Sequence, residues 1–156
     1  MNGRLRIARL ADHPEVIPTI REWFETEWEP HYGPNGPGNA EQDLLAYANG
    51  TELPVGVVAF LGDEPCGIAA LKMGSITTHA HLSPWAAAGM VSPLYRGQGI
   101  GGELLCAIEE VARTLGYAHI YCGTATANRL LERSGWEFME QVRYSGENVS
   151  IYVKAL

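Results

Sequence analysis

The chain has 156 residues, which predicts a single domain over residues 1–156 with enough length for a full hydrophobic core. Its formal net charge of −7 argues against binding to nucleic acids, because such binding depends on neutralising phosphates with basic side chains. No apolar run is long enough to span a bilayer and no signal-peptide pattern opens the chain, so we expect a cytoplasmic protein with neither a membrane nor a nucleic-acid partner.

The cysteines carry no sign of a metal centre or of a disulfide framework. Cys66, Cys106 and Cys122 are an odd number, lack the spacing of metal ligands and each lie in an apolar run. We therefore expect reduced, buried thiols and no metal site.

The first third of the chain predicts one strand and two helices that are separated by a loop. Asp12 and Glu15 have the spacing of a capping box, which predicts that a helix starts at Asp12. A stripe of apolar and aromatic residues continues this helix as far as Trp28, before Pro30. The elements expected in this part are a strand at 5–10, a helix ending before Pro30, a Gly- and Pro-rich loop at 31–39 and a helix at 40–48.

Three apolar strands are expected in the middle of the chain. Residues 55–61 and 66–73 are apolar runs that a turn at 62–65 joins as a hairpin. Residues 85–91 form a third run, which is short and flanked by prolines, so a strand is favoured over a helix. Gly89 inside this run indicates a bulge or a close approach of a ligand to the backbone.

A glycine-rich turn follows the third of these strands and opens a helix. Glycines occupy four of the six positions 97–102, directly after Pro93 has ended the strand. An amphipathic helical pattern then runs from Ile100 to Leu115, and Gly116 follows at the position of a C-terminal cap. The stretch thus predicts a strand, a turn and a helix in close succession.

This turn has the composition of an anion site. The first amides of a helix have no partner within the helix and attract negative charge, and Arg96 adds a guanidinium suited to phosphate oxygens. We therefore expect a diphosphate to bind at the turn. The alternative interpretation is a tight turn that needs glycines only for its own backbone.

Two nucleotide-binding motifs compete for this stretch. Gly97, Gly99 and Gly102 match the dinucleotide fingerprint of NAD-dependent oxidoreductases. That fingerprint needs an acidic residue about 20 positions later, and residues 116–122 contain none. A P-loop is excluded because no Gly-Lys-Ser/Thr follows the glycines.

The turn has a more specific likeness. Arg96-x-x-Gly99-x-Gly101 resembles the acyl-CoA pyrophosphate motif of the GNAT acyltransferases, R/Q-x-x-G-x-G/A. The longer string Val91-x-Pro93-x-Tyr95-Arg96-Gly97-x-Gly99-Ile100-Gly101 resembles the fuller and more specific form of that motif.

The expected order of elements is similar to the GNAT order over nearly the whole chain. After the glycine-rich turn and its helix, the remaining expected elements are a strand at 119–122, a helix at 127–133 capped by Thr126, and a hairpin of 136–144 with 149–153. The resemblance therefore implies an α/β fold with a GNAT-like mixed central sheet of about seven strands and helices on both faces.

The resemblance implies an N-acetyltransferase that moves an acetyl group from acetyl-CoA to a primary amine by direct attack in a ternary complex. The strands that end at Val91 and surround Ile120 would splay to take the pantetheine arm, and the bulge near Gly89 would point an amide at the thioester carbonyl. The acetyl-CoA contacts implied in this way are Met90, Val91, Arg96, Gly97, Gln98, Gly99, Ile100, Gly101 and Gly102.

The same resemblance places the acceptor site under the region between the first two strands. Glu27 and Tyr32 are our candidate substrate-binding residues there, for a small-molecule or peptide amine. The sequence assigns no catalytic residue, because the run 85–91 contains no ionisable side chain. Further candidates for the acceptor site or the general base are Glu29, His31, His79 and His81. The C-terminal strands could support a homodimer.

One position departs from the family pattern. Many members carry a tyrosine as general acid, and alignment on Gly135 puts Leu131 at that position. A thiol with a pKa around 8.5 can leave as a thiolate without an acid, so activity is not excluded. The alternative hypothesis is a non-catalytic regulatory or accessory module that binds acyl-CoA.

Overall fold

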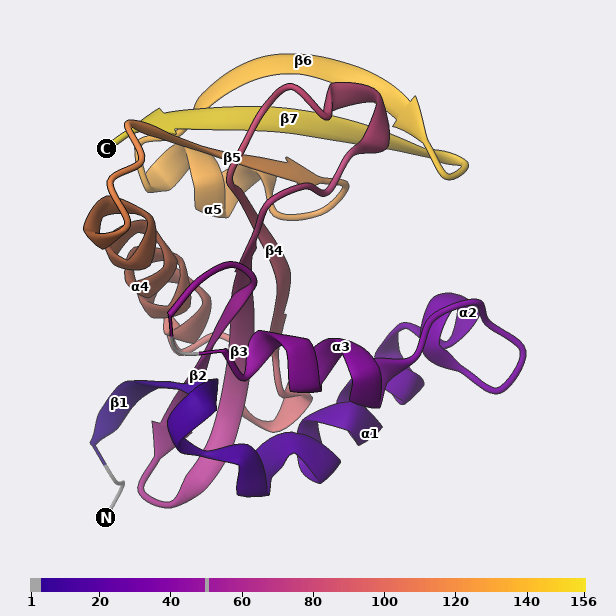
Figure 1. Ribbon diagram of the computed structural model, residues 1–156, viewed down its shortest axis with the longest axis vertical. Coiled ribbons are helices and arrows are strands. Elements are labelled where there is room, and N and C mark those ends of the chain that lie inside the picture. Colours follow the sequence, from indigo (N-terminus) through magenta and orange to yellow (C-terminus); the bar gives the residue numbers. More distant parts are fainter. Residues whose placement is uncertain (1–3, 50) are drawn as a thin grey trace.

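The computed structural model describes residues 4–49 and 51–156, whose strands form a seven-stranded sheet in the order β1-β2-β3-β4-β5-β7-β6 (Figure 1). The strands are β1 Leu5–Arg9, β2 Val55–Leu61, β3 Glu64–Lys72, β4 Trp85–Val91, β5 His119–Thr124, β6 Glu137–Tyr144 and β7 Glu147–Ala155. β4 and β5 pair in parallel, and the other neighbours pair antiparallel. The predicted mixed sheet is therefore confirmed.

Helices cover both faces of this sheet, as predicted (Figure 1). They are α1 Ile17–Glu27, α2 Glu29–Tyr32, α3 Ala40–Tyr47, α4 Ile100–Thr114 and α5 Asn128–Arg133. β2 is buried on both sides, and alternate residues meet different helices: Val57 lies in the core under α4, and Val58 in the core under α1 and α3. Within the described residues, no helix is both long enough and apolar enough to cross a bilayer.

The N-terminal helix starts later than predicted. Asp12 caps no α-helix; residues 10–16 form two short 3₁₀ turns, and α1 begins at Ile17. The reason is Pro18, which has no N–H to donate and is tolerated only in the first turn of a helix. A helix starting at Asp12 would place this proline in its interior. Pro30 likewise becomes the second residue of α2 instead of ending the helical region.

The helix after the glycine-rich turn agrees with the prediction. α4 buries Ile100, Leu104, Leu105 and Ile108 against the sheet. At its end Gly116 adopts a φ of 89°, the left-handed conformation expected of a C-terminal cap.

The prediction of three buried cysteines is wrong for two of them. Cys66 is buried and Cys122 only partly buried, whereas Cys106 is exposed. Cys106 lies on the solvent side of α4, two positions from Leu104, and two residues correspond to about 200° around a helix.

Candidate active site

The two parallel strands at the centre of the sheet separate after a single paired position. Trp85 lies opposite Tyr121, and the Tyr121 amide donates to the Pro84 carbonyl over 3.0 Å. Beyond this point no further register pairs join the described parts of β4 and β5. The sheet is thus open between β4 and β5.

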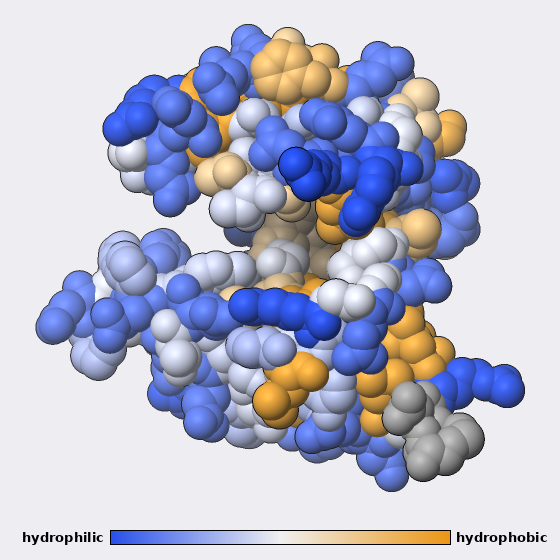
Figure 2. All heavy atoms as spheres, turned by 180° about the vertical axis from the view of Figure 1, so that it is seen from behind, coloured by the Kyte–Doolittle hydropathy of each residue, from blue (hydrophilic) through white to orange (hydrophobic). Residues whose placement is uncertain are grey.

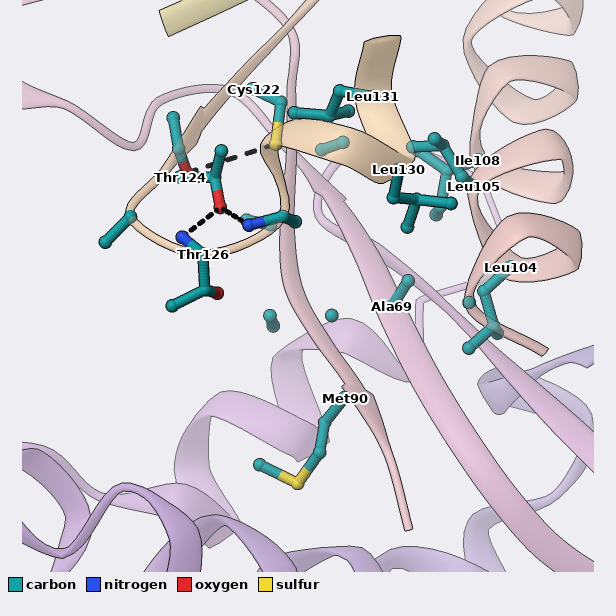
Figure 3. Close-up of a pocket in the computed structure, with 18 of the residues that line it drawn as sticks. Ala69, Met90, Leu104, Leu105, Ile108, Cys122, Thr124, Thr126, Leu130 and Leu131 are labelled. Carbon is teal, nitrogen blue, oxygen red and sulfur yellow. Dashed lines mark hydrogen bonds between the residues drawn. The ribbon is translucent and has the colours of Figure 1, made fainter. Parts of the chain in front are cut away.

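The opening is a cleft with a volume of about 560 Å³. Figure 2 shows it from behind as a deep notch between two lobes, with hydrophobic and neutral residues at its base. In Figure 3, Leu104, Leu105 and Ile108 of α4 line one side, Cys122 and Thr124 of β5 another, and Met90 lies at the lower end.

The β4 wall of the cleft carries the predicted bulge. Ile68 pairs with Met90 and Ala70 with Ala87, so Ala88 and Gly89 both lie opposite the single residue Ala69. The positive φ of this bulge, 55°, falls on Ala88 and not on the glycine. A bulge interrupts regular pairing and re-aims the backbone, here at a strand that lines the cleft.

The glycine-rich turn lies where the cleft meets the N-terminus of α4. Gly97 and Gly99 have φ values of 81° and 82°, and Gly99 is the N-cap of the helix. Nothing lies within 4 Å of the position that a Cβ would take at either glycine. The backbone at this turn is therefore open to a ligand, and the first amides of α4 are available to an anion.

Arg96, the basic residue of the turn, already has two partners. Its Nε donates to the Val91 carbonyl over 3.0 Å, which holds the side chain beside the end of β4. Its Nη2 forms an ion pair with Glu27 at the end of α1. A predicted acetyl-CoA residue and a predicted acceptor residue are thus in direct contact.

Tyr32, the other predicted acceptor residue, lies away from the cleft. Its hydroxyl donates to Asp43 over 2.6 Å, and its ring stacks on Phe24 at 5.4 Å. Burial and the Asp43 carboxylate raise the pKa of Tyr32, so the phenol stays protonated. Trp28, between α1 and α2, lines the cleft. In the sequence it is the last residue of an apolar and aromatic stripe.

The histidine candidates lie outside the cleft lining as well. The His79 imidazole is hydrogen-bonded to the Glu140 carboxylate of β6, and His81 packs beside it with ring centroids 5.8 Å apart. Glu29 and His31 belong to the short helix α2. None of these four side chains is among the described residues that line the cleft.

Leu131, at the position where many family members carry a tyrosine, lies in the cleft wall. Leu131 is 2% exposed and lines the cleft. The hydroxyls that line it belong to Thr124 and Thr126 (Figure 3). Thr124, and not Thr126 as predicted, holds the turn before α5: its Oγ1 accepts from the amides of Thr126 and Ala127 over 3.1 and 2.8 Å. The Thr124 hydroxyl proton remains free to be donated.

Cys122 is the cysteine that lines the cleft, where it lies beside Thr124. Desolvation raises the pKa of its thiol to about 12. Because the thiolate and not the thiol is the nucleophile, this raised pKa disfavours a nucleophilic role for Cys122 at neutral pH.

Comparisons with known proteins agree with this geometry. The model of the acetyltransferase (GNAT) family matches residues 17–136, so the chain belongs to this family. It is an acyltransferase, and acetyl-CoA is its co-substrate. A search of curated protein sequences found no significant match.

Solved structures of the same fold have low sequence identity to the chain. An aminoglycoside 6'-N-acetyltransferase complexed with coenzyme A has 14% identity and a TM-score of 0.78, with 96% of each chain covered. An N-acetyltransferase from Staphylococcus aureus Mu50 has 14% identity and a TM-score of 0.77, covering 98% of this chain and 99% of the other. Polyamine N-acetyltransferase from Drosophila melanogaster has 14% identity and a TM-score of 0.72, covering 98% and 100%.

Two cleft residues were missed by the sequence analysis. Trp28 is one more member of an apolar helical stripe in the sequence, and Glu147 lies in the turn expected between 136–144 and 149–153, yet both line the cleft. No local pattern separates them from such neighbours. Only the packing of α1 and β7 around the sheet brings them to the same cavity.

Proposed function

We propose that the protein acetylates a primary amine by direct attack on acetyl-CoA within a ternary complex. The observation that carries the proposal is the cleft between β4 and β5, which runs beside a bulged strand and ends at the glycine-rich turn. The names of two structural neighbours, an aminoglycoside and a polyamine N-acetyltransferase, support an amine as the acceptor.

The residues of the turn would bind the diphosphate of acetyl-CoA. The open glycines allow close approach of the backbone, the N-terminus of α4 supplies amides, and Arg96 supplies charge. Contacts are proposed for Met90, Val91, Arg96, Gly97, Gln98, Gly99, Ile100, Gly101 and Gly102. The apolar residues of the cleft would exclude water from the pantetheine arm.

The bulge would supply the electrostatic part of catalysis. A backbone amide at Ala88–Met90 that donates to the thioester oxygen stabilises negative charge as the amine attacks, and one such donor contributes about 2.7–4 kcal/mol. The N–C bond forms, the C–S bond breaks, and the nitrogen loses a proton to solvent while the sulfur leaves as a thiolate. The raised pKa of Cys122 supports direct attack, because the cleft then offers no reactive thiolate for an acyl-enzyme.

A first experiment is calorimetric titration with acetyl-CoA, followed by a thiol-release assay with a panel of amines. Binding together with amine-dependent thiol release supports the proposal. Binding without release from any amine would favour a non-catalytic acyl-CoA-binding module, for which Leu131 at the usual tyrosine position is the supporting observation. Absence of binding contradicts both functions.

A further inference from the structure

The cleft has one charged side chain and one aromatic ring among the described residues that line it. The charge is the carboxylate of Glu147, and the ring is the indole of Trp28. The other lining residues are apolar, glycine or threonine, apart from Cys122, whose raised pKa keeps its thiol neutral. Among the described lining residues, recognition of a cation by a charged side chain therefore depends on Glu147.

The two residues approach the cleft from different lobes. Trp28 lies at the junction of α1 and α2, and Glu147 begins β7 just after the β6–β7 turn. In Figure 1 these two parts of the chain extend on the same side of β4, the α1–α2 segment lower and the β6–β7 turn higher in the view. An acceptor that enters the cleft on this side passes between them.

Strand register locates Glu147 relative to the reacting centre. Trp85 and Tyr121 are paired, so Ala88 of the bulge and Thr124 each lie three residues further along their parallel strands. Thr124 pairs with Ser150 of β7, and Glu147 lies three residues beyond Ser150. At about 3.4 Å per residue, the Glu147 Cα lies about 10 Å beyond Ser150 along β7, and the separation of β4 from β5 adds to its distance from the bulge.

This position of Glu147 indicates which nitrogen of the acceptor its carboxylate can bind. The attacking amine must lie at the bulge and be neutral, and an ammonium at that point cannot attack. A carboxylate that lies three residues beyond Ser150 on β7 is away from the bulge, and instead stabilises a positive charge elsewhere in the acceptor. The Trp28 ring adds an aromatic face, which also favours a cation.

We infer that the acceptor is a diamine or a larger polycation, one end of which reacts while Glu147 and Trp28 bind a second cationic group. The inference rests on the proposed function and names its substrate class. Glu147 is a specificity-determining residue that never touches the reacting atoms.

The test compares hexamethylenediamine with hexylamine, which has the same carbon number and one cation fewer. Glu147 is exposed, so wild type should have a KM for the diamine up to about fivefold below that for the monoamine, the value of an exposed ion pair. Glu147→Gln should abolish this difference by raising the diamine KM more than the hexylamine KM. Glu137→Gln, which removes a carboxylate from exposed β6 of the same hairpin, controls for overall charge.

Calorimetry with the CoA-loaded protein gives a readout independent of turnover. The diamine should bind wild type and Glu137→Gln with equal affinity and bind Glu147→Gln up to about fivefold more weakly. Equal use of both amines, or a diamine KM that Glu147→Gln leaves unchanged, overturns the inference and leaves the proposed function intact. Failure of every amine to release thiol overturns the proposed function and the inference together.

Discussion

Arg96 connects the proposed acetyl-CoA site to the end of α1. Its guanidinium has a fixed position, through the hydrogen bond to Val91, and a carboxylate partner, Glu27. Both side chains of this pair are partly exposed, at 53% and 33%, so the pair is weak and can be exchanged for a stronger anion. A diphosphate at the turn would compete with Glu27 for Arg96.

Replacing the arginine tests its role in binding. Arg96→Ala removes the charged donor but leaves the glycines and the α4 amides, so the fold should persist and the Kd for acetyl-CoA should rise about tenfold. Calorimetry measures the affinity, and thermal unfolding checks the fold. An unchanged Kd would mean that the backbone amides alone hold the phosphates.

Replacing its partner should have the opposite effect. Glu27→Gln removes the competing carboxylate, so acetyl-CoA should bind up to about fivefold more tightly, the value of an exposed ion pair. Glu22→Gln, an exposed glutamate on the same helix, is the matched control and should leave the Kd unchanged. Weaker binding in Glu27→Gln would show that the ion pair positions Arg96 instead of competing for it.

At the scale of elements, the turn into α4 depends on backbone conformation. Gly99 caps the helix with a φ of 82°, a region in which a side chain costs about 1–2 kcal/mol. No atom lies within 4 Å of a Cβ built at this glycine, so a substitution there would test conformation without any clash.

Gly99→Ala should therefore lower the free energy of unfolding by about 1 kcal/mol and the Tm by roughly 2–4 °C. Gly74→Ala is the control, because Gly74 also has open space around its Cβ position and no positive φ. Denaturant unfolding of both variants measures the difference. A Gly99→Ala protein as stable as the control would show that the turn relaxes to a conformation that alanine tolerates.

For the whole molecule, an ion pair with a buried carboxylate, Glu109, ties α4 to the C-terminal part of the sheet. Glu109 of α4 is 5% exposed, accepts from the Trp136 indole over 3.0 Å and pairs with Lys154 of β7 over 2.9 Å. Lys154 also donates to the Ser134 carbonyl over 2.8 Å. Because β4 and β5 share one paired position, contacts of this kind help to hold the two lobes around the cleft.

Glu109→Ala leaves the partly buried Lys154 ammonium and the buried Trp136 indole N–H without their carboxylate, and should destabilise the protein by about 2–3 kcal/mol. Glu110→Ala on the same helix is the comparison, since its ion pair with Arg113 is exposed and contributes at most about 1 kcal/mol. Urea unfolding followed by circular dichroism separates the two. A loss of under 1 kcal/mol for Glu109→Ala would contradict this role.

The sequence by itself determined the features that depend on neighbouring residues. Apolar runs at 55–61 and 85–91 became strands with those same bounds, and the glycine-rich turn and its helix formed where the spacing predicted. The bulge near Gly89 was foreseen for the same reason. Strand alternation, helical periodicity and positive φ are local properties, so they can be read without knowledge of what packs against them.

Only the tertiary structure decided which side chains share the cleft. Tyr32 bonds to Asp43 outside it, Glu27 pairs with Arg96, and Trp28 and Glu147 enter the lining. These contacts join residues far apart along the chain, through the separation of β4 from β5 and the extension of β7 past β5. A local pattern cannot predict them, because the partner of each side chain is set by the packing of whole strands and helices and not by its neighbours in sequence.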